Sequence, residues 1–223
     1  MKKILLFYLF LLLPFLAFAS PVQIGNLFYE LSSTDKTAEV TSPAFEEGVT
    51  DIELVIPDKV TYDGVTYAVK KIRQSAFWGC RTITSLIISE GVESIGESAF
   101  GDCGSICSLT LPNSLKKIGD WAFFASSQLA SVIIPKNVEE IGYEAFNFNS
   151  LSSIVVNEDN PYFDSRNNCN ALIETATNTL LTGCKNTVIP NTVTAIGDGA
   201  FSNCRFTSIK LPDNLKSIGN SAF

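Results

Sequence analysis

The chain has 223 residues, with 16 lysines and arginines against 23 aspartates and glutamates, six cysteines and no histidine, for a formal net charge of −7. Only 17 % of the residues are charged, which argues against a disordered acidic protein, and the lack of a basic stretch argues against nucleic-acid binding. Without histidine, the commonest general base and the commonest zinc ligand are missing, although carboxylate chemistry stays open.

The first 19 residues predict a secretory signal peptide. A basic start at Lys2 and Lys3 precedes an apolar run over 4–18, and a small-x-small cleavage site ends at Ala19. An uncleaved membrane anchor is the alternative, but the run is shorter than the ~20 residues that a spanning helix needs. Cleavage leaves 14 basic against 23 acidic residues, a net charge of −9. We therefore expect an exported protein without a transmembrane segment.

Residues 20–68 predict a β-rich cap. Segments 27–31, 37–41 and 52–56 have the composition of strands, and Asp63-Gly64 between 60–62 and 65–67 predicts a hairpin with a type I′ turn. The chain that follows consists of repeats, and the first core face of a repeat array must be covered. Residues 20–68 are therefore expected to cover the first core face of the repeats.

Residues 69–223 contain an internal repeat with three elements in phase. Ala-Phe recurs six times, Ile-Gly precedes most copies, and an apolar strand that often ends in proline follows. The repeated phenylalanines are Phe77, Phe100, Phe123, Phe146, Phe201 and Phe223. A period of 22–23 residues with one short strand per unit predicts a solenoid of leucine-rich-repeat type.

Each repeat unit also predicts a short helical turn after its Ile-Gly pair. Ile95, Ala99 and Cys103 fall at i, i+4 and i+8, which places them on one face of a helix. The small side chains of Gly96 and Ala99 would let neighbouring units approach closely. The expected fold class is therefore α/β, with one strand and one helical turn per coil.

One interval of 55 residues contains an enlarged unit, with a predicted β-hairpin at 156–188. Its strands are expected at 171–174 and 179–182. Cys169 and Cys184 are equidistant from the centre of the turn, so a symmetric hairpin would set them opposite each other, within disulfide range. In an exported protein this pair is a candidate disulfide, and two free thiols are the alternative.

The remaining polar residues predict no metal site and no cofactor. Cys80, Cys103 and Cys204 share one repeat position and are expected to be small buried side chains. Cys103 and Cys107 lack the further ligands of a zinc site, and the acidic insertion at 157–160 lacks the spacing of a calcium loop.

The repeat motif resembles that of the BspA-like leucine-rich repeat family. The resemblance rests on Ile95-Gly96-x-x-Ala99-Phe100 followed by Cys103 and by a strand ending in Leu111-Pro112, and on the 61–67 hairpin and residues 162–171. It covers essentially the whole mature chain. It implies a right-handed solenoid in a secreted or cell-surface protein of Bacteroides-type bacteria. It also implies adhesion to host proteins or to other cells, and it supplies no catalytic residues.

The strand face that points away from the core is the candidate binding site. A ladder of serines and β-branched residues is unusual for a purely solvated face, although β propensity alone would also select these residues. Solenoids present such faces as extended, concave binding surfaces. The predicted ligand-binding residues are Ser85, Ile87, Ser108, Thr110, Ser131, Ile133, Ser153, Val155, Ser208 and Lys210.

The chain ends inside a repeat, at residues 218–223, so we expect either a truncated chain or an end covered by another subunit. The predicted function is binding of protein partners, with adhesion to host or neighbouring-cell proteins as its use, and no enzymatic activity. One alternative is a structural spacer that presents a module beyond Phe223. Another is a carbohydrate-active enzyme resembling a β-helix, which would carry carboxylates on a strand column. The oligomeric state is left open.

Overall fold

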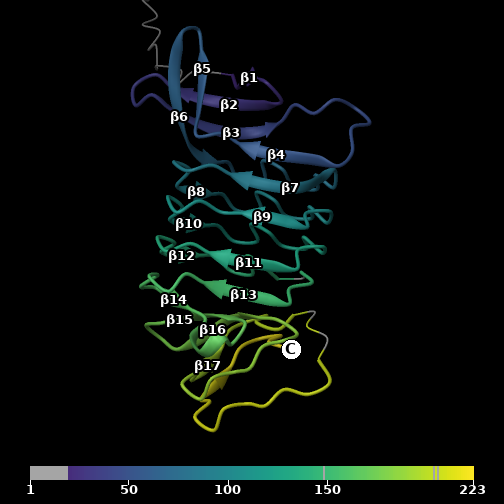
Figure 1. Cartoon of the computed structure of the whole chain (residues 1–223), viewed down its shortest axis with the longest axis vertical. Coiled ribbons are helices and arrows are strands. Elements are labelled where there is room, and N and C mark those ends of the chain that lie inside the picture. The colour runs from purple at the N-terminus through teal and green to yellow at the C-terminus, as the bar shows by residue number, and fades with distance from the viewer. Residues whose placement is uncertain (1–19, 148, 203, 205) are drawn as a thin grey trace, which may run out of the picture.

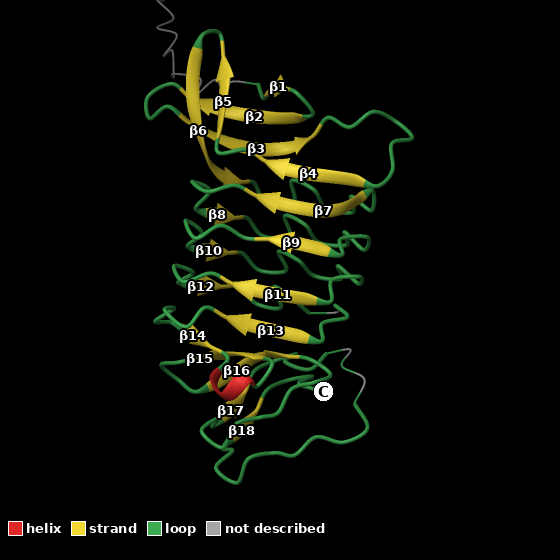
Figure 2. Ribbon diagram, in the orientation of Figure 1, coloured by secondary structure: helices red, strands yellow, loops and turns green. Residues whose placement is uncertain are grey.

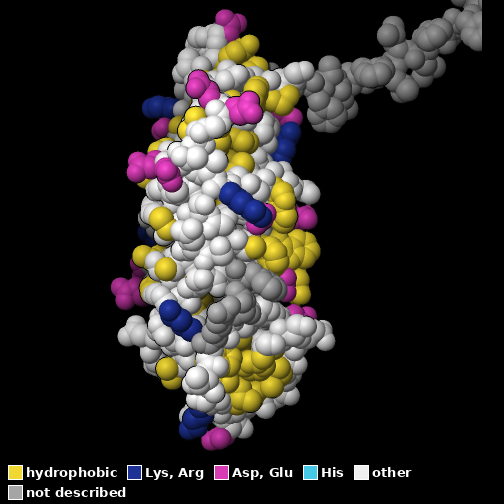
Figure 3. Space-filling model, turned by 90° about the vertical axis from the view of Figure 1, so that its right-hand side faces the viewer, with side chains coloured by type: hydrophobic (Ala, Val, Ile, Leu, Met, Phe, Trp, Pro, Cys, Tyr) yellow, Lys and Arg dark blue, Asp and Glu magenta, His cyan; other side chains and the backbone are white. Residues whose placement is uncertain are grey.

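The computed structural model describes residues 20–147, 149–202, 204 and 206–223 as an elongated stack of strands (Figures 1 and 2). The predicted signal peptide at 1–19 lies outside the described residues. The stack runs nearly straight in two perpendicular views (Figures 1 and 3). Figure 3 also shows lysines, arginines and acidic residues scattered singly over the visible face.

The N-terminal end of the stack is a small sheet. Strands β1 (Val22–Ile24), β2 (Leu27–Ser32) and β3 (Thr37–Pro43) pair antiparallel, and β3 pairs parallel with β6 (Val65–Ile72). Strand β5 (Lys59–Tyr62) forms a hairpin with β6. At its turn, Asp63 and Gly64 have φ of 47° and 72°, as a type I′ turn requires. The predicted Asp-Gly hairpin is therefore confirmed.

Two parallel strand ladders run along the stack, one on each side of the core. The outer ladder contains β4 (Ile52–Ile56), β7 (Ile83–Ile88) and β9 (Ser108–Thr110), followed by the pair β11 (Ser131–Ile134) and β13 (Ser153–Val156). The second ladder continues from β6 through β8 (Ser94–Ile95), β10 (Lys117–Ile118) and β12 (Glu140–Ile141). Strand β4, from the predicted cap, is thus paired in register with the strands of the repeats.

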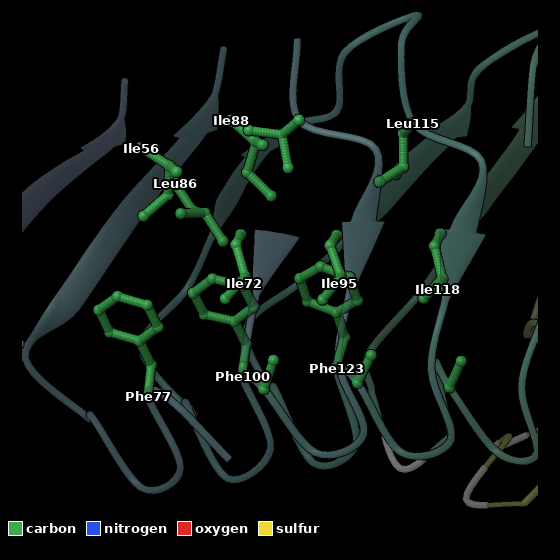
Figure 4. Close-up of a cluster of buried hydrophobic side chains, with 14 of the residues drawn as sticks. Ile56, Ile72, Phe77, Leu86, Ile88, Ile95, Phe100, Leu115, Ile118 and Phe123 are labelled. Carbon is green, nitrogen blue, oxygen red and sulfur yellow. The ribbon is translucent and has the colours of Figure 1, made fainter. Parts of the chain in front are cut away.

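The Ala-Phe copies form a stacked aromatic column in the core (Figure 4). Ring centroids are 5.0 Å apart for Phe77 and Phe100, 5.5 Å for Phe100 and Phe123, and 5.3 Å for Phe123 and Phe146, with nearly parallel planes. Figure 4 shows the isoleucines of the second ladder beside these rings. A single coil cannot bury these side chains, so the stack itself creates the core.

The predicted helical turns are wrong, and with them the α/β class: within the described residues the regular units contain strands and turns, and a short 3-10 helix occurs in the enlarged unit. At the turn the residue before alanine has positive φ, 54° at both Ser75 and Ser98, which interrupts a right-handed helix. Successive backbone N–H groups of the turn then point alternately within the coil and towards the next coil. Ala99 N–H donates to Gly96 O within the coil, whereas the N–H of Phe100 donates to Ala122 O of the next coil at 2.8 Å.

The hydrogen bonds that a helix would keep internal therefore join neighbouring coils. Close approach is needed for this, and the Ile-Gly glycine provides it. A Cβ on Gly119 would lie only 2.6 Å from the backbone nitrogen of Glu97 in the preceding coil. The expected close packing of coils at this glycine is correct, although the local structure is a turn.

The enlarged unit contains the predicted hairpin, formed by β15 (Ala171–Glu174) and β16 (Thr179–Gly183). Strand β14 (Phe163–Asp164) pairs with β15, and a three-residue 3-10 helix, Arg166–Asn168, lies between them. Strand β16 pairs parallel with β17 (Ala195–Ile196), and β17 with β18 (Ser217–Ile218). Leu172 packs in the N-terminal core cluster, whereas its neighbours Ala171 and Ile173 pack in a second, C-terminal cluster.

Candidate protein-binding face

The outer ladder presents an exposed row of β-branched side chains, because alternate residues of a strand point to opposite faces. Val55 pairs with Ile87, Ile87 with Thr110, and Ile133 with Val155. The exposed fractions are 49 % for Val55, 41 % for Ile87, 65 % for Ile133 and 43 % for Val155, and Thr110 is also exposed. The residues between them in sequence point into the core.

A row of serines runs beside these side chains. Ser85 pairs with Ser108, and Ser131 pairs with Ser153. Ser108 and Ser131 are exposed, and the other two are partly buried. The surface formed by both rows is called the outer strip; its residues are Glu53, Val55, Ser85, Ile87, Ser108, Thr110, Ser131, Ile133, Ser153 and Val155.

Two predicted site residues, Ser208 and Lys210, do not belong to the strip. Both are exposed, but they lie in a segment without strand structure. The outer ladder ends at β13, because the outer positions of the following units, 186–190 and 206–212, have no strand structure, whereas β17 and β18 lie at the same repeat position as β8, β10 and β12. The repeat spacing alone could not show this break.

Sequence reasoning missed Glu53 and Val55, which begin the strip. Strand β4 was assigned to the cap, yet it pairs residue for residue with β7 from Glu53 to Ile56. An apolar strand ending in Ile56-Pro57 repeats the pattern of Ile134-Pro135. That pattern could have placed β4 in the ladder.

At its C-terminal end the strip opens into a hollow of about 480 Å³. Ile133 and Val155 line one side, and residues 156–158 and 164–168 line the other. Arg166 fixes the loop: it donates to Asp164 through Nε at 2.7 Å and to Asn178 Oδ1 through Nη1 at 2.7 Å. The hydrogen bond to the Asp164 carboxylate raises the pKa of Arg166, so the guanidinium stays charged beside it.

The second ladder presents charged side chains that are largely paired with one another. Lys70 Nζ and Lys116 Nζ lie 2.8 and 2.9 Å from the two carboxylate oxygens of Glu93, and Lys117 Nζ lies 2.6 Å from Glu140. The hydrogen bonds from Lys70 and Lys116 lower the pKa of Glu93. The two faces of the stack therefore differ in chemistry, since the outer strip is apolar and hydroxylated.

All six cysteines are described and all are free thiols, so the candidate disulfide between Cys169 and Cys184 is not formed. A β-bulge explains this: Leu172 pairs with Thr182 but Ile173 pairs with Leu180. The extra residue shifts the register by one, and a shift of one residue turns a side chain to the other face. Cys184 Sγ accordingly contacts Asn170 O at 3.3 Å, and the two cysteines pack in different core clusters.

The repeat position three residues after phenylalanine is a hydrogen-bond donor as well as a small buried group. Cys103 Sγ donates to Phe77 O at 3.0 Å, and Ser126 Oγ donates to Phe100 O at 3.3 Å. Asn149 Nδ2 donates likewise to Phe123 O at 3.1 Å. Burial raises the pKa of the Cys103 thiol to about 12, so this cysteine is neutral and has little nucleophilic character.

In the ranges that the structure describes, no three carboxylate or thiol side chains gather as a metal site would require. Within those same ranges, no helix has the length and apolar character needed to cross a membrane.

The family model described as BspA type leucine-rich repeat region matches residues 58–174 and 177–223 in six copies. No curated protein sequence matches the chain. A solved leucine-rich repeat protein from Bacteroides capillosus is 27 % identical with a TM-score of 0.54, covering 62 % of this chain and 99 % of its own.

Two more distant solved structures are similar in fold. A leucine-rich repeat protein from Bacteroides ovatus is 24 % identical with a TM-score of 0.55, covering 89 % of this chain and 61 % of its own. The pneumococcal vaccine antigen PcpA is 19 % identical with a TM-score of 0.62, covering 90 % of this chain and 66 % of its own. The chain thus spans roughly two thirds or less of the length of these two proteins.

Proposed function

The chain belongs to the BspA-type leucine-rich-repeat family, and from that premise we propose that it is a secreted or cell-surface protein that binds other proteins through its outer strip. The proposed biological use is adhesion to host proteins or to proteins of neighbouring cells. The family consists of repeat proteins rather than enzymes, and apart from Glu53 the strip carries aliphatic and hydroxyl side chains suited to contact.

The observation that carries the proposal is the exposure of four aliphatic side chains in one row. Single exposed hydrophobic residues are common, but a contiguous apolar patch usually marks an interaction site. The row stands on paired, hydrogen-bonded strands, so a partner would meet a preorganised surface and little ordering entropy would be lost on binding. The serine row beside it offers hydroxyl groups that both donate and accept hydrogen bonds.

The test compares two variants in binding to a panel of purified extracellular and cell-surface proteins. The double variant Ile87→Glu, Ile133→Glu places two charges in the strip and should abolish binding while leaving the circular dichroism spectrum unchanged. The control Tyr62→Glu alters a side chain that is 44 % exposed in the β5–β6 hairpin, outside the strip, and it should bind as the wild type does. Equal binding by wild type and double variant would refute the proposal.

A further inference from the structure

The hollow at the end of the outer strip has the composition of a pocket for one side chain of the bound protein. Its volume of about 480 Å³ lies within the usual range of ligand pockets. Ile133 and Val155 provide an apolar wall, and Asn157, Asn167 and Asn168 provide amide groups at the rim. A side chain with an apolar stem and a polar end fits this combination.

The charge of the hollow is negative. Three charged residues line it, and two of them, Asp164 and Arg166, neutralise each other. The third, Glu158, is exposed, and no hydrogen bond or ion pair links its carboxylate to any residue that the structure describes. A cationic group entering the hollow would therefore find one carboxylate that is free to accept it.

The other end of the outer strip carries a matching carboxylate. Glu53 in β4 is exposed and likewise has no hydrogen-bond or ion-pair partner within the described part of the chain. Between β4 and β13 lie four strand spacings, on the order of 19 Å. The strip is thus an apolar, hydroxylated surface with an unpaired acid at each end, which favours a partner with the opposite charge pattern.

We infer that the bound protein inserts a lysine or arginine side chain into the hollow, with its stem against Ile133 and Val155 and its cationic end on Glu158. The apolar residues beside that lysine or arginine then lie along the remainder of the strip. This inference rests on the proposed function, because it describes the partner of the same surface.

The probe is a random library of 12-residue displayed peptides, selected on the full protein. The selected peptides should carry lysine or arginine next to β-branched or other apolar residues. Glu158→Gln should weaken their binding by about tenfold or more, since a charge-assisted contact is lost. The matched control Asp159→Asn removes a neighbouring exposed carboxylate that does not line the hollow, and it should bind as the wild type does.

Replacing the peptide lysine by norleucine keeps the stem and removes the charge, so the loss should match that of Glu158→Gln and should not add to it. Equal affinity for wild type and Glu158→Gln, or selected peptides without a basic residue, would overturn the inference. If the selected peptides meet either of these outcomes but bind Ile87→Glu more weakly than wild type, the proposed function stands, because Ile87 lies outside the hollow. Peptides indifferent to both variants, or no selection above a blank surface, would overturn both.

Discussion

At the scale of single residues, thiol and phenol groups that are buried or partly buried make the stability of this chain sensitive to alkaline pH. Burial raises the pKa of Cys103 to about 12 and that of Cys204 to about 11, and it raises the pKa of Tyr29 to about 12. Each of these groups is neutral when protonated. In the unfolded chain it would lose its proton at a lower pH than in the folded protein.

Folding stability should therefore be intact below pH 9 and should fall as the pH rises from about 9 towards 12, because the unfolded state there binds fewer protons. Cys103→Ser removes the thiol but keeps a hydrogen-bond donor like that of Ser126. Its free energy of unfolding should therefore fall less steeply with pH than that of wild type, by up to about 1.4 kcal/mol per pH unit. Urea unfolding at pH 8 to 11 measures this slope. The control Cys107→Ser changes an exposed thiol and should keep the wild-type slope. A slope for Cys103→Ser equal to that of wild type would contradict the account.

At the scale of elements, the sequence predicted strands better than turns. Strand faces and register followed from alternation, as in the pairing of Ile133 with Val155. The spacing of Ile95, Ala99 and Cys103 suits a helix equally well as a turn, because both bring these side chains to the core. What decides between them is where the backbone N–H groups find acceptors, and those acceptors lie in the next coil. A single unit therefore does not contain the deciding information.

Local sequence was likewise insufficient to predict the register of the hairpin. Its strands and turn follow from local composition, but the bulge between Leu172 and Ile173 does not. The bulge places Cys169 and Cys184 one residue out of register with each other. The error at the cysteine pair thus arises in the enlarged unit, whereas Ser208 and Lys210 lie beyond it, in a segment without strand structure.

The hydrogen bonds between the turns of neighbouring coils require close approach at Gly119 but not at Gly104. Gly119→Ala would place a Cβ 2.6 Å from the backbone nitrogen of Glu97, where only movement of a whole coil could relieve the clash. We expect a loss of about 1–3 kcal/mol in the free energy of unfolding. Gly104→Ala would meet only Ser127 Oγ at 3.4 Å and should leave the Tm unchanged or slightly higher. Thermal unfolding of both variants measures this, and equal Tm values would argue against coil contact at Gly119.

At the scale of the whole molecule, one stack carries two different faces. The second ladder pairs its charges internally, as in Lys70–Glu93–Lys116, and exposed pairs of this kind contribute little to stability. The outer ladder keeps its apolar side chains in register and exposed to solvent. The sequence predicted this outer row from β7 to β13. Its beginning at Val55 and its end at the hollow depend on pairings between distant segments.

The central claim is that proteins bind on the outer strip, and site-specific photocrosslinking tests it most directly. A benzophenone amino acid at Thr110, in the middle of the strip, should form a covalent complex with a panel protein that the wild type binds. The same group at Tyr62, in the β5–β6 hairpin outside the strip, should form none. Crosslinking from Tyr62, or none from Thr110 while that variant still binds, would contradict the account.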